Sequence, residues 1–342
     1  MRSLTLCAAL ISAATTTATL RAETHRYVPA QSYNTYAAAH PPALRIKSGD
    51  RVATTTLEGM AQTGPFFIEG AEPGDLIVVS IEKLEPNRAT GMSSSVMAAA
   101  SFDSGGLSNK NAPLVPWTID KPHGVVRLDL KQVIPNVDWA ARYSPPVYEL
   151  PLRPALGSIG VAPANGESLD SRIAGPFGGN VDAAAVAAGA KVLLPVYSPG
   201  ALLFLGHGLA RHGDGDVTGT GIETTLDVEF SVEVVKKKEW PHSSVARAST
   251  IAGEFELGWP RVETADYLMA IGGATSLEQA LQHATTELHH WLDDDFGFSE
   301  RSLSIFLGPA IEYEVANVAG PSFTVVAKVR KSYIPHIASA AQ

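Results

Sequence analysis

The sequence contains a single cysteine, Cys7, among its 342 residues. Cys7 lies in an uncharged stretch, Leu4 to Leu20, which follows Arg2 and has the composition of a secretory signal peptide. Leu20-Arg21-Ala22 ends in a small residue, as a signal cleavage site does, and we therefore expect residues 1–22 to be removed during export. The mature chain would then have no disulfide and no thiol nucleophile. We expect it to be secreted or periplasmic.

No long apolar run follows the signal segment, so we expect no membrane association after its cleavage. Positive charge is also scarce, because the 26 Lys and Arg residues are outnumbered by 35 Asp and Glu residues. The formal net charge is −9. Loss of Arg2 and Arg21 would make the chain more acidic still, which argues against binding to nucleic acid. Hydrophobic residues make up 45% of the chain and charged residues 18%, which is typical of a globular protein.

Several catalytic signatures are missing from the sequence. No Gly-x-Ser-x-Gly elbow occurs, and Gly91-Met92-Ser93-Ser94-Ser95 resembles a serine amidase signature only superficially. The chain has no P-loop, no Gly-x-Gly-x-x-Gly fingerprint and no His-Glu-x-x-His zinc motif. Without a thiol or an activated serine, a metal-activated water is the most economical mechanism for a hydrolase.

The chain is rich in turn-forming residues, with 30 glycines and 23 prolines, as expected of many short strands. Leu226 to Val235 is the clearest strand pattern, because Val228, Phe230, Val232 and Val234 alternate with polar residues. One face of this strand is therefore expected to be buried. Other strand patterns lie at residues 44–46, 52–56, 76–81, 125–130 and 157–162.

Two further segments shape the expected topology. Residues 191–195 and 201–205 flank a Ser198-Pro199-Gly200 turn and predict a hairpin. Residues 86–125 show little periodicity and many turn-forming residues, so we expect a long surface insertion that could cover a site. No linker divides the chain clearly, and residues 23–342 are interpreted as one domain with an optional subdivision near residue 240.

One long helix is predicted after residue 275. Ser276 has the position of an N-cap, with Gln279 at the capping-box spacing. Apolar residues then repeat at helical spacing until three consecutive aspartates mark the expected end, and they are Leu277, Leu281, Ala284, Leu288 and Trp291. A second, short helix is expected after Ser299.

The densest group of chemically active residues lies in residues 206–216, Gly-His-Gly-Leu-Ala-Arg-His-Gly-Asp-Gly-Asp. Imidazoles and carboxylates in a glycine-rich loop can converge on one cation, because glycine lets the backbone curl around it. A polar hairpin loop with solvated charges is the alternative. His283, His289 and His290 on the predicted helix lack the four-residue spacing of metal ligands, which favours satisfied or solvated side chains.

A second group lies in residues 175–182, Gly-Pro-Phe-Gly-Gly-Asn-Val-Asp. Asn180 could donate a hydrogen bond to a substrate carbonyl, and Asp182 could bind a metal or act as a base. The residues alone favour an ordinary turn with an Asx cap before the alanine-rich segment 183–188.

The segments 175–182 and 206–216, taken in order along the chain with several shorter blocks, resemble the acetamidase/formamidase family over roughly residues 40 to 330. The loop formula of that family, approximately Gly-Asp-x-His-Ala-x-Gln-Gly-Asp-Gly-Glu, is altered here, because His207, Leu209 and His212 replace its Asp, His and Gln, and Asp216 replaces its final Glu. The matching blocks are Ser48-Gly49-Asp50, Gly64-Pro65, residues 69–75 (Glu-Gly-Ala-Glu-Pro-Gly-Asp), residues 160–164 (Gly-Val-Ala-Pro-Ala), residues 178–182 (Gly-Gly-Asn-Val-Asp), Leu194-Pro195-Val196 and Gly200-Ala201-Leu202.

The resemblance implies a mainly β fold, a β-sandwich or barrel-like structure with a smaller α+β C-terminal portion. It also implies a bound divalent metal, zinc or alternatively calcium, and hydrolysis of small amides of the formamide, acetamide or lactam type to a carboxylate and ammonia or an amine. For the assembly of this chain, a homo-oligomer is one of the expected options.

Roles for individual residues follow from the resemblance and the two groups together. We expect His207, His212 and Asp214 to bind the metal, with Asp182 as a fourth ligand. In the reaction itself, Asp216 or Glu223 would be the general base, Asn180 would stabilise the oxyanion and Glu69 would hold the leaving amine. Leu209 cannot coordinate a metal, and it favours the alternative of a degenerate relative that binds a small solute or partner without hydrolysis.

Overall fold

The computed structural model describes residues 22–103, 113–136, 146–239 and 258–334. Most of the expected signal peptide, residues 1–21, lies outside these ranges. Strands account for 43% and helices for 17% of the described residues, and the sheets are sandwich-like without closing into barrels. The mainly β fold predicted from the sequence is therefore confirmed.

The first sheet has nine strands among the described residues, and it runs through most of the chain. Its clearest predicted member, β18, pairs antiparallel with β4 on one side and with β6 on the other. The strand order is β1 (Thr24–Arg26), β4 (Arg51–Thr55), β18 (Leu226–Val235), β6 (Leu76–Pro86), β15 (Lys191–Pro195), β19 (Arg261–Glu263), β20 (Tyr267–Ala274), β22 (Phe323–Arg330) and β21 (Glu312–Asn317).

The second sheet, with eleven strands in the described ranges, carries the residues of interest. β3 (Leu44–Ile46) pairs with β5 (Gln62–Ile68), and β5 pairs with β16. The other strands follow in the order β10 (Val147–Pro151), β9 (Val125–Asp129), β8 (Val115–Asp120), β7 (Thr90–Ser93), β17 (Ile222–Glu223), β16 (Leu203–Arg211), β11 (Ala155–Gly160), β14 (Gly178–Asn180) and β13 (Ala174–Gly175). A separate pair joins β2 (Thr35–Ala37) to β12 (Ser168–Asp170).

The main hydrophobic core gathers the inward-facing residues of both sheets. In β18, Val228, Phe230 and Val232 are buried as predicted, while Val234 is only partly buried, near the end of the strand. Phe230 packs edge-on against Phe66 of β5, with ring centroids 5.3 Å apart. Since β18 and β5 belong to different sheets, this contact joins the two sheets.

The predicted hairpin between residues 191–195 and 201–205 is wrong. β15 pairs with β6 and β19 in the first sheet, whereas β16 lies in the second sheet. The connecting turn passes between the sheets, and Gly200, Ala201 and Leu202 all adopt positive φ there. The sequence marks the turn correctly, but a local pattern cannot tell a hairpin from a crossover between sheets.

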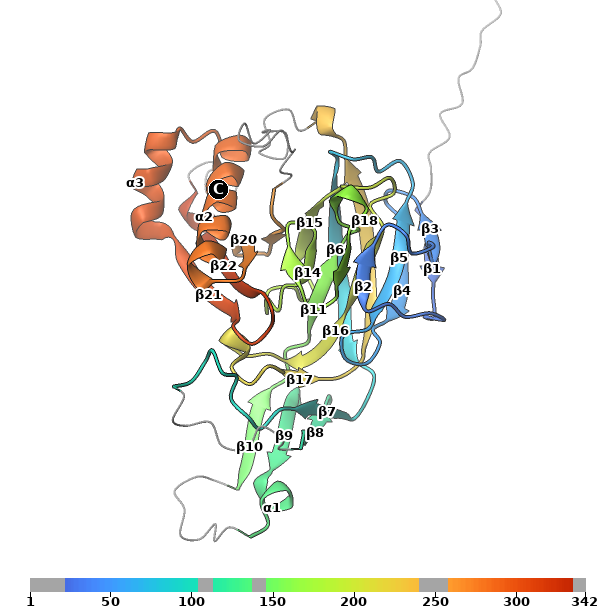
Figure 1. The fold of residues 1–342 in the computed structure, drawn as a ribbon, viewed down its shortest axis with the longest axis vertical. Coiled ribbons are helices and arrows are strands. Elements are labelled where there is room, and N and C mark those ends of the chain that lie inside the picture. The colour runs from blue at the N-terminus through green and yellow to red at the C-terminus, as the bar shows by residue number, and fades with distance from the viewer. Residues whose placement is uncertain (1–21, 104–112, 137–145, 240–257, 335–342) are drawn as a thin grey trace, which may run out of the picture.

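The expected insertion at residues 86–125 is an extension of the second sheet. β7 and β8 from this stretch pair with each other and, together with β9 and β10, form a lobe that projects from the body (Figure 1). The short helix α1 (Leu130–Val133) lies at the far end of this lobe. The segment that follows β7 contacts the segment that follows β16, because the Ala98 amide donates a hydrogen bond to the Val217 carbonyl at 2.8 Å.

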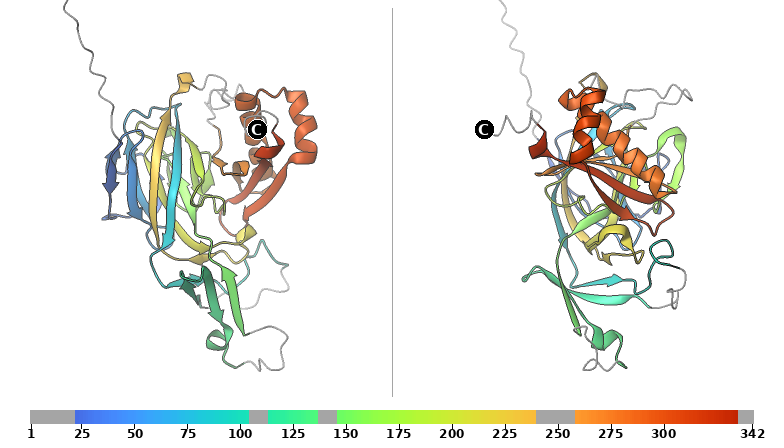
Figure 2. Two further views of the ribbon diagram at one scale, coloured as in Figure 1. Left: turned by 180° about the vertical axis from the view of Figure 1, so that it is seen from behind. Right: turned by 90° about the vertical axis from the view of Figure 1, so that its left-hand side faces the viewer.

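The C-terminal portion places two helices beside β20 and β22, as both views in Figure 2 show. α2 (Leu277–Phe296) begins at the predicted N-cap, where the Ser276 hydroxyl accepts from the Gln279 amide, and α3 (Glu300–Ala310) follows Ser299. The predicted apolar stripe is partly wrong, because Leu277 and Leu281 are exposed. The buried face instead includes Ala280, against Gly272 of β20.

The optional subdivision near residue 240 falls at residues 240–257, which lie outside the described part of the chain. On either side of that gap the first sheet is continuous, because β19 pairs with β15. No helix in the described ranges is long and apolar enough to cross a membrane.

Candidate active site

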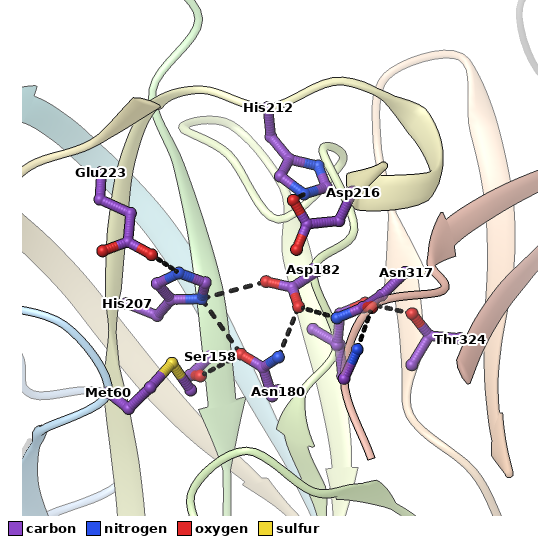
Figure 3. Close-up of polar contacts among 12 residues, drawn as sticks. Met60, Ser158, Asn180, Asp182, His207, His212, Asp216, Glu223, Asn317 and Thr324 are labelled. Carbon is purple, nitrogen blue, oxygen red and sulfur yellow. Dashed lines mark hydrogen bonds and ion pairs between the residues drawn. The ribbon is translucent and has the colours of Figure 1, made fainter. Parts of the chain in front are cut away.

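The second sheet brings together residues from three distant stretches of the chain. Ser158 on β11 pairs with Asn180 on β14 and with Gly206 on β16, and Glu223 on β17 pairs with Leu209 on β16. Paired residues on neighbouring strands lie side by side. His207 therefore lies between the β14 and β17 contributions, and we call His207, Asp182, Asn180 and Glu223 the His207 cluster (Figure 3).

His207 lies between two carboxylates. Its Nδ1 atom is 3.0 Å from Asp182 Oδ1 and 3.1 Å from Asn180 Oδ1, while its Nε2 atom is 3.3 Å from Glu223 Oε1. Burial alone would lower the pKa of His207, but the charges of Asp182 and Glu223 and their hydrogen bonds outweigh it and raise the pKa to about 10. At neutral pH, His207 is therefore an imidazolium that donates through both ring nitrogens.

Asp182 is the fully buried anion of the cluster. Its Oδ2 atom accepts from the amide nitrogens of Asn180 and Asn317, each at 2.5 Å. Burial alone would raise the pKa of Asp182, but the charge of His207 and the hydrogen bonds from His207 and Asn317 outweigh it, so the pKa is lowered. Asp182 is therefore ionised at neutral pH.

The amide of Asn180 is engaged on both sides. Its nitrogen donates to Asp182, and its oxygen accepts from the Ser158 hydroxyl at 3.0 Å and from His207. These contacts fix the orientation of the amide, with the nitrogen toward a carboxylate inside the protein. The side chain thus orients its neighbours, and it does not match the predicted role of an oxyanion donor.

The backbone at this site adopts the left-handed region at three non-glycine residues. His207, Asp182 and Asp216 have φ values of 50°, 47° and 45°. Such conformations are unfavourable for residues with a Cβ and are concentrated at functional sites. Gly157, opposite the cluster, leaves the necessary space, because an added Cβ would lie against His207 Nδ1 and 2.7 Å from Asp182 Oδ1.

His212 and Asp216 form a second, adjacent pair. Their side chains are buried, and His212 Nε2 lies 3.6 Å from Asp216 Oδ1, which is too far for a hydrogen bond. Neither atom has a hydrogen-bond partner, whereas Asp182 Oδ1 is paired with His207 Nδ1. Figure 3 shows His212 and Asp216 on the side of Asp182 away from Asn180.

The predicted set of four metal ligands is not assembled. The described residues contain no group of three or more His, Cys, Asp or Glu side chains already arranged to hold a metal. Both ring nitrogens of His207 face carboxylates, which leaves neither nitrogen open to a metal in this arrangement. Asp214 does not fit either, since it is exposed at the start of the 3₁₀ turn Asp214–Asp216.

Three donor atoms remain that suit a cation. His212 Nε2 and Asp216 Oδ1 are buried without hydrogen-bond partners, and Asp182 Oδ1 is buried with His207 as its ion-pair partner. One imidazole with two carboxylates is a donor set that zinc accepts. Buried polar atoms are rarely left unsatisfied in native proteins. These three residues therefore fit a metal by donor type, whereas His207 and Asp214 do not.

Two other sequence-identified residues lie apart from the cluster. Glu69 is exposed and lies 4.0 Å from Arg45, at the end of β5 remote from Gln62, the residue that pairs with Gly206. Seven residues of extended strand separate Glu69 from Gln62 by about 20 Å, so Glu69 does not reach the cluster. Leu209 is buried on β16 and has no polar role.

Sequence reasoning missed Ser158, Gly157 and Asn317. Ser158 and Gly157 lie in a strand pattern without any motif, and Asn317 is a single asparagine at the end of β21. Only the pairing of β11 with β14 and β16, and the approach of β21 to residue 182, give these residues a role.

Comparison with known proteins connects this site to a family. The sequence profile of the Acetamidase/Formamidase family matches residues 172–329, which include the whole His207 cluster. The crystal structure of an acetamidase from Yersinia enterocolitica superposes with a TM-score of 0.73 at 26% identity, covering 91% of this chain and 93% of that chain. The chain is therefore similar to acetamidase/formamidase proteins, in sequence over residues 172–329 and in fold over most of its length.

Two further proteins also resemble this chain. A Schizosaccharomyces pombe protein named "Putative formamidase" is 28% identical over 212 residues, which is 51% of each chain, so the match spans about half the length of that relative. A structure of a gamma lactamase from Delftia acidovorans shares the fold, with a TM-score of 0.52 at 18% identity over 92% of this chain and 94% of that chain.

Proposed function

We propose that this protein is an exported amide hydrolase that cleaves the C–N bond of a small carboxamide, linear or cyclic, to give a carboxylate and ammonia or an amine. The observation that carries the proposal is the buried imidazolium of His207 held between Asp182 and Glu223. The match to the family profile and the acetamidase neighbour support amide hydrolysis as the reaction class. The expected signal segment supports export.

Glu223 is the general base of the proposed reaction. Its side chain is 27% exposed, whereas those of His207 and Asp182 are at most 4% exposed, so Glu223 is the carboxylate of the cluster that water reaches. The Nε2–H group of His207 donates to Glu223 and fixes its orientation. Glu223 takes a proton as water adds to the amide carbon, and returns it to the leaving nitrogen as the C–N bond breaks.

A divalent metal, zinc or alternatively calcium, is part of the proposal. His212, Asp216 and Asp182 would hold it, because His212 Nε2 and Asp216 Oδ1 are buried without hydrogen-bond partners and Asp182 is the buried carboxylate next to them. Such an ion polarises a carbonyl oxygen and lowers the pKa of bound water. This assignment moves Asp216 from the role of base to that of ligand, because its side chain is only 5% exposed.

The deciding experiment measures ammonia or amine release from a panel of small amides and lactams, with and without a chelator. His212→Ala and Asp214→Ala make a matched pair in one loop, since the first residue is buried beside the unpartnered atoms and the second is exposed. We expect His212→Ala to lower both metal content and activity, and Asp214→Ala to change neither. Equal metal content in the parent and both variants would rule out this metal site.

A second candidate is a degenerate relative that binds a small solute or partner without hydrolysing it. Its support is Leu209, which is 1% exposed and occupies the position of the family's histidine. Under this alternative, no member of the panel releases ammonia, whereas an amide still protects the protein against thermal unfolding by mass action. Turnover of any amide that depends on Glu223 would exclude it.

A further inference from the structure

The segment between β21 and β22 extends from the C-terminal portion into the site. The Val318 amide donates to the Gly215 carbonyl at 2.9 Å, in the loop that carries Asp216. The Thr324 hydroxyl donates to the Val181 carbonyl at 2.9 Å, next to Asp182. The C-terminal portion therefore holds both the 213–216 loop and the 180–182 segment.

Asn317 is the residue of this segment that contacts a charged group. Its side-chain oxygen accepts from the backbone amides of Ala319 and Gly320 at 2.6 and 2.9 Å. Those two bonds fix which end of the amide is oxygen, so its nitrogen must face Asp182 Oδ2 at 2.5 Å. Asn317 is 2% exposed, so its contact with Asp182 is shielded from bulk solvent.

The consequence concerns the orientation of Asp182. Its Oδ2 atom is saturated by two amide donors, Asn180 and Asn317, and this leaves Oδ1 as the oxygen that faces His207. Asp182 also has a φ of 47°, a conformation that surrounding contacts must maintain. A donor that approaches from the C-terminal portion is one of those contacts.

We propose that Asn317 is a positioning residue that fixes the Asp182 carboxylate against His207 and so orients Glu223. This inference rests on the proposed function for its effect on turnover, but its effect on the two side chains can be measured without turnover. Residues that orient a catalytic group from the next layer typically change activity by about 10- to 100-fold when they are replaced.

Two variants of Asn317 and one control variant distinguish orientation of the Asp182 carboxylate from general stabilisation of the fold. Asn317→Ser keeps an oxygen that can accept from the Ala319 amide in the same turn, but it is too short to donate to Asp182. Asn317→Asp keeps the size and the acceptor, but it turns a carboxylate toward Asp182. Thr324→Val is the control, because it removes the neighbouring bond to Val181 without touching Asp182.

We expect kcat to fall about 10- to 100-fold in Asn317→Ser and further in Asn317→Asp, with KM changed by less than about threefold. Thr324→Val should keep the parent kcat per folded molecule, even if its melting temperature falls as much as those of the Asn317 variants. Equal kcat in the Ser variant and the parent, or equal losses in the Ser variant and Thr324→Val, would overturn the proposal.

The second readout is the ¹⁵N and ¹H spectrum of the His207 ring in chelator-treated protein without substrate. The Nδ1–H resonance should move in both Asn317 variants and remain in place in Thr324→Val. This measurement stands even if the parent releases no ammonia, so a failure of the proposed function is distinguishable from a failure of the Asn317 assignment. An unchanged His207 resonance in both Asn317 variants would refute that assignment.

Discussion

His207 and Asp182 form an ion pair in which neither side chain is more than 4% exposed, with 3.0 Å between Nδ1 and Oδ1. Breaking such a pair from one side leaves the other charge buried and uncompensated. The pair therefore stabilises this part of the fold only while both groups are charged.

Replacing His207 with glutamine should cost about 3–5 kcal/mol of unfolding free energy at about pH 6, because Asp182 loses its counter-charge. The pKa of His207 is raised from 6.5 to about 10, so its contribution is fully present below about 6.5 and is lost as pH rises through 10. The pKa of Asp182 is lowered, so the Asp182 contribution is present above the ordinary aspartate value and is lost in acid.

Denaturant unfolding of the parent and His207→Gln across this pH range measures the difference directly. We expect the difference in free energy to be largest between about pH 5 and 7 and to shrink as pH approaches and passes 10. A difference that stays constant from pH 6 to 10.5 would mean that His207 is not charged in the folded protein.

Gly157→Ala should disrupt the same pair by sterics alone. The added methyl would lie against His207 Nδ1 and 2.7 Å from Asp182 Oδ1, so one of the two side chains must move. We expect destabilisation of about 1–3 kcal/mol, as for overpacking, and a loss of amide hydrolysis. Gly308→Ala in α3 is the control, because nothing lies within 4 Å of its added Cβ. It should be neutral or stabilising by about 0.5–1 kcal/mol.

Glu223→Gln tests the proposed base. It should lower kcat by about 100- to 10,000-fold while metal content stays at the parent level, because Glu223 is not among the proposed ligands. It also removes one of the two charges that raise the pKa of His207, and that pKa should fall. Glu233→Gln, at an exposed position on β18, serves as the matched control. Full activity in Glu223→Gln would remove Glu223 from the mechanism.

The contact between the two sheets can be tested at Phe230. Its ring is 1% exposed, and Phe230→Ala should cost roughly 3–5 kcal/mol as a large-to-small core change. Glu233→Ala, on the exposed side of the same strand, should cost about 0.5 kcal/mol or less. Similar urea midpoints for the two variants would contradict the packing of β18 between the sheets.

The elements that the sequence predicts well are those whose pattern reflects burial. The alternation in 226–235 becomes β18, and the Ser276 cap begins α2, because one buried face and one capped end are local properties. The hairpin at 191–205 fails because the partner of a strand is a non-local property. Leu281 is exposed because α2 packs through its alanines onto Gly272, which helical spacing alone cannot indicate.

The site was predictable in part for the same reason. The loop after β16 contains conspicuous residues, and the structure gathers His207, Asp182, Asn180 and Glu223 from the expected stretches. Their roles were less predictable, because the charge state of His207 depends on carboxylates 25 and 16 positions away in sequence, and only folding brings those carboxylates to the ring. Asn317 carries no sequence signal at all.

The hydrogen bond from Asn317 to Asp182 spans 135 positions of the chain. During synthesis, every member of the His207 cluster leaves the ribosome before Asn317, the residue that holds Asp182 in place. Contacts of such long sequence separation form late, after the local strand pairs. A nascent or truncated chain that ends before β21 would thus carry all the charged groups of the site without their final arrangement, and catalytic competence would be acquired only with the last strands.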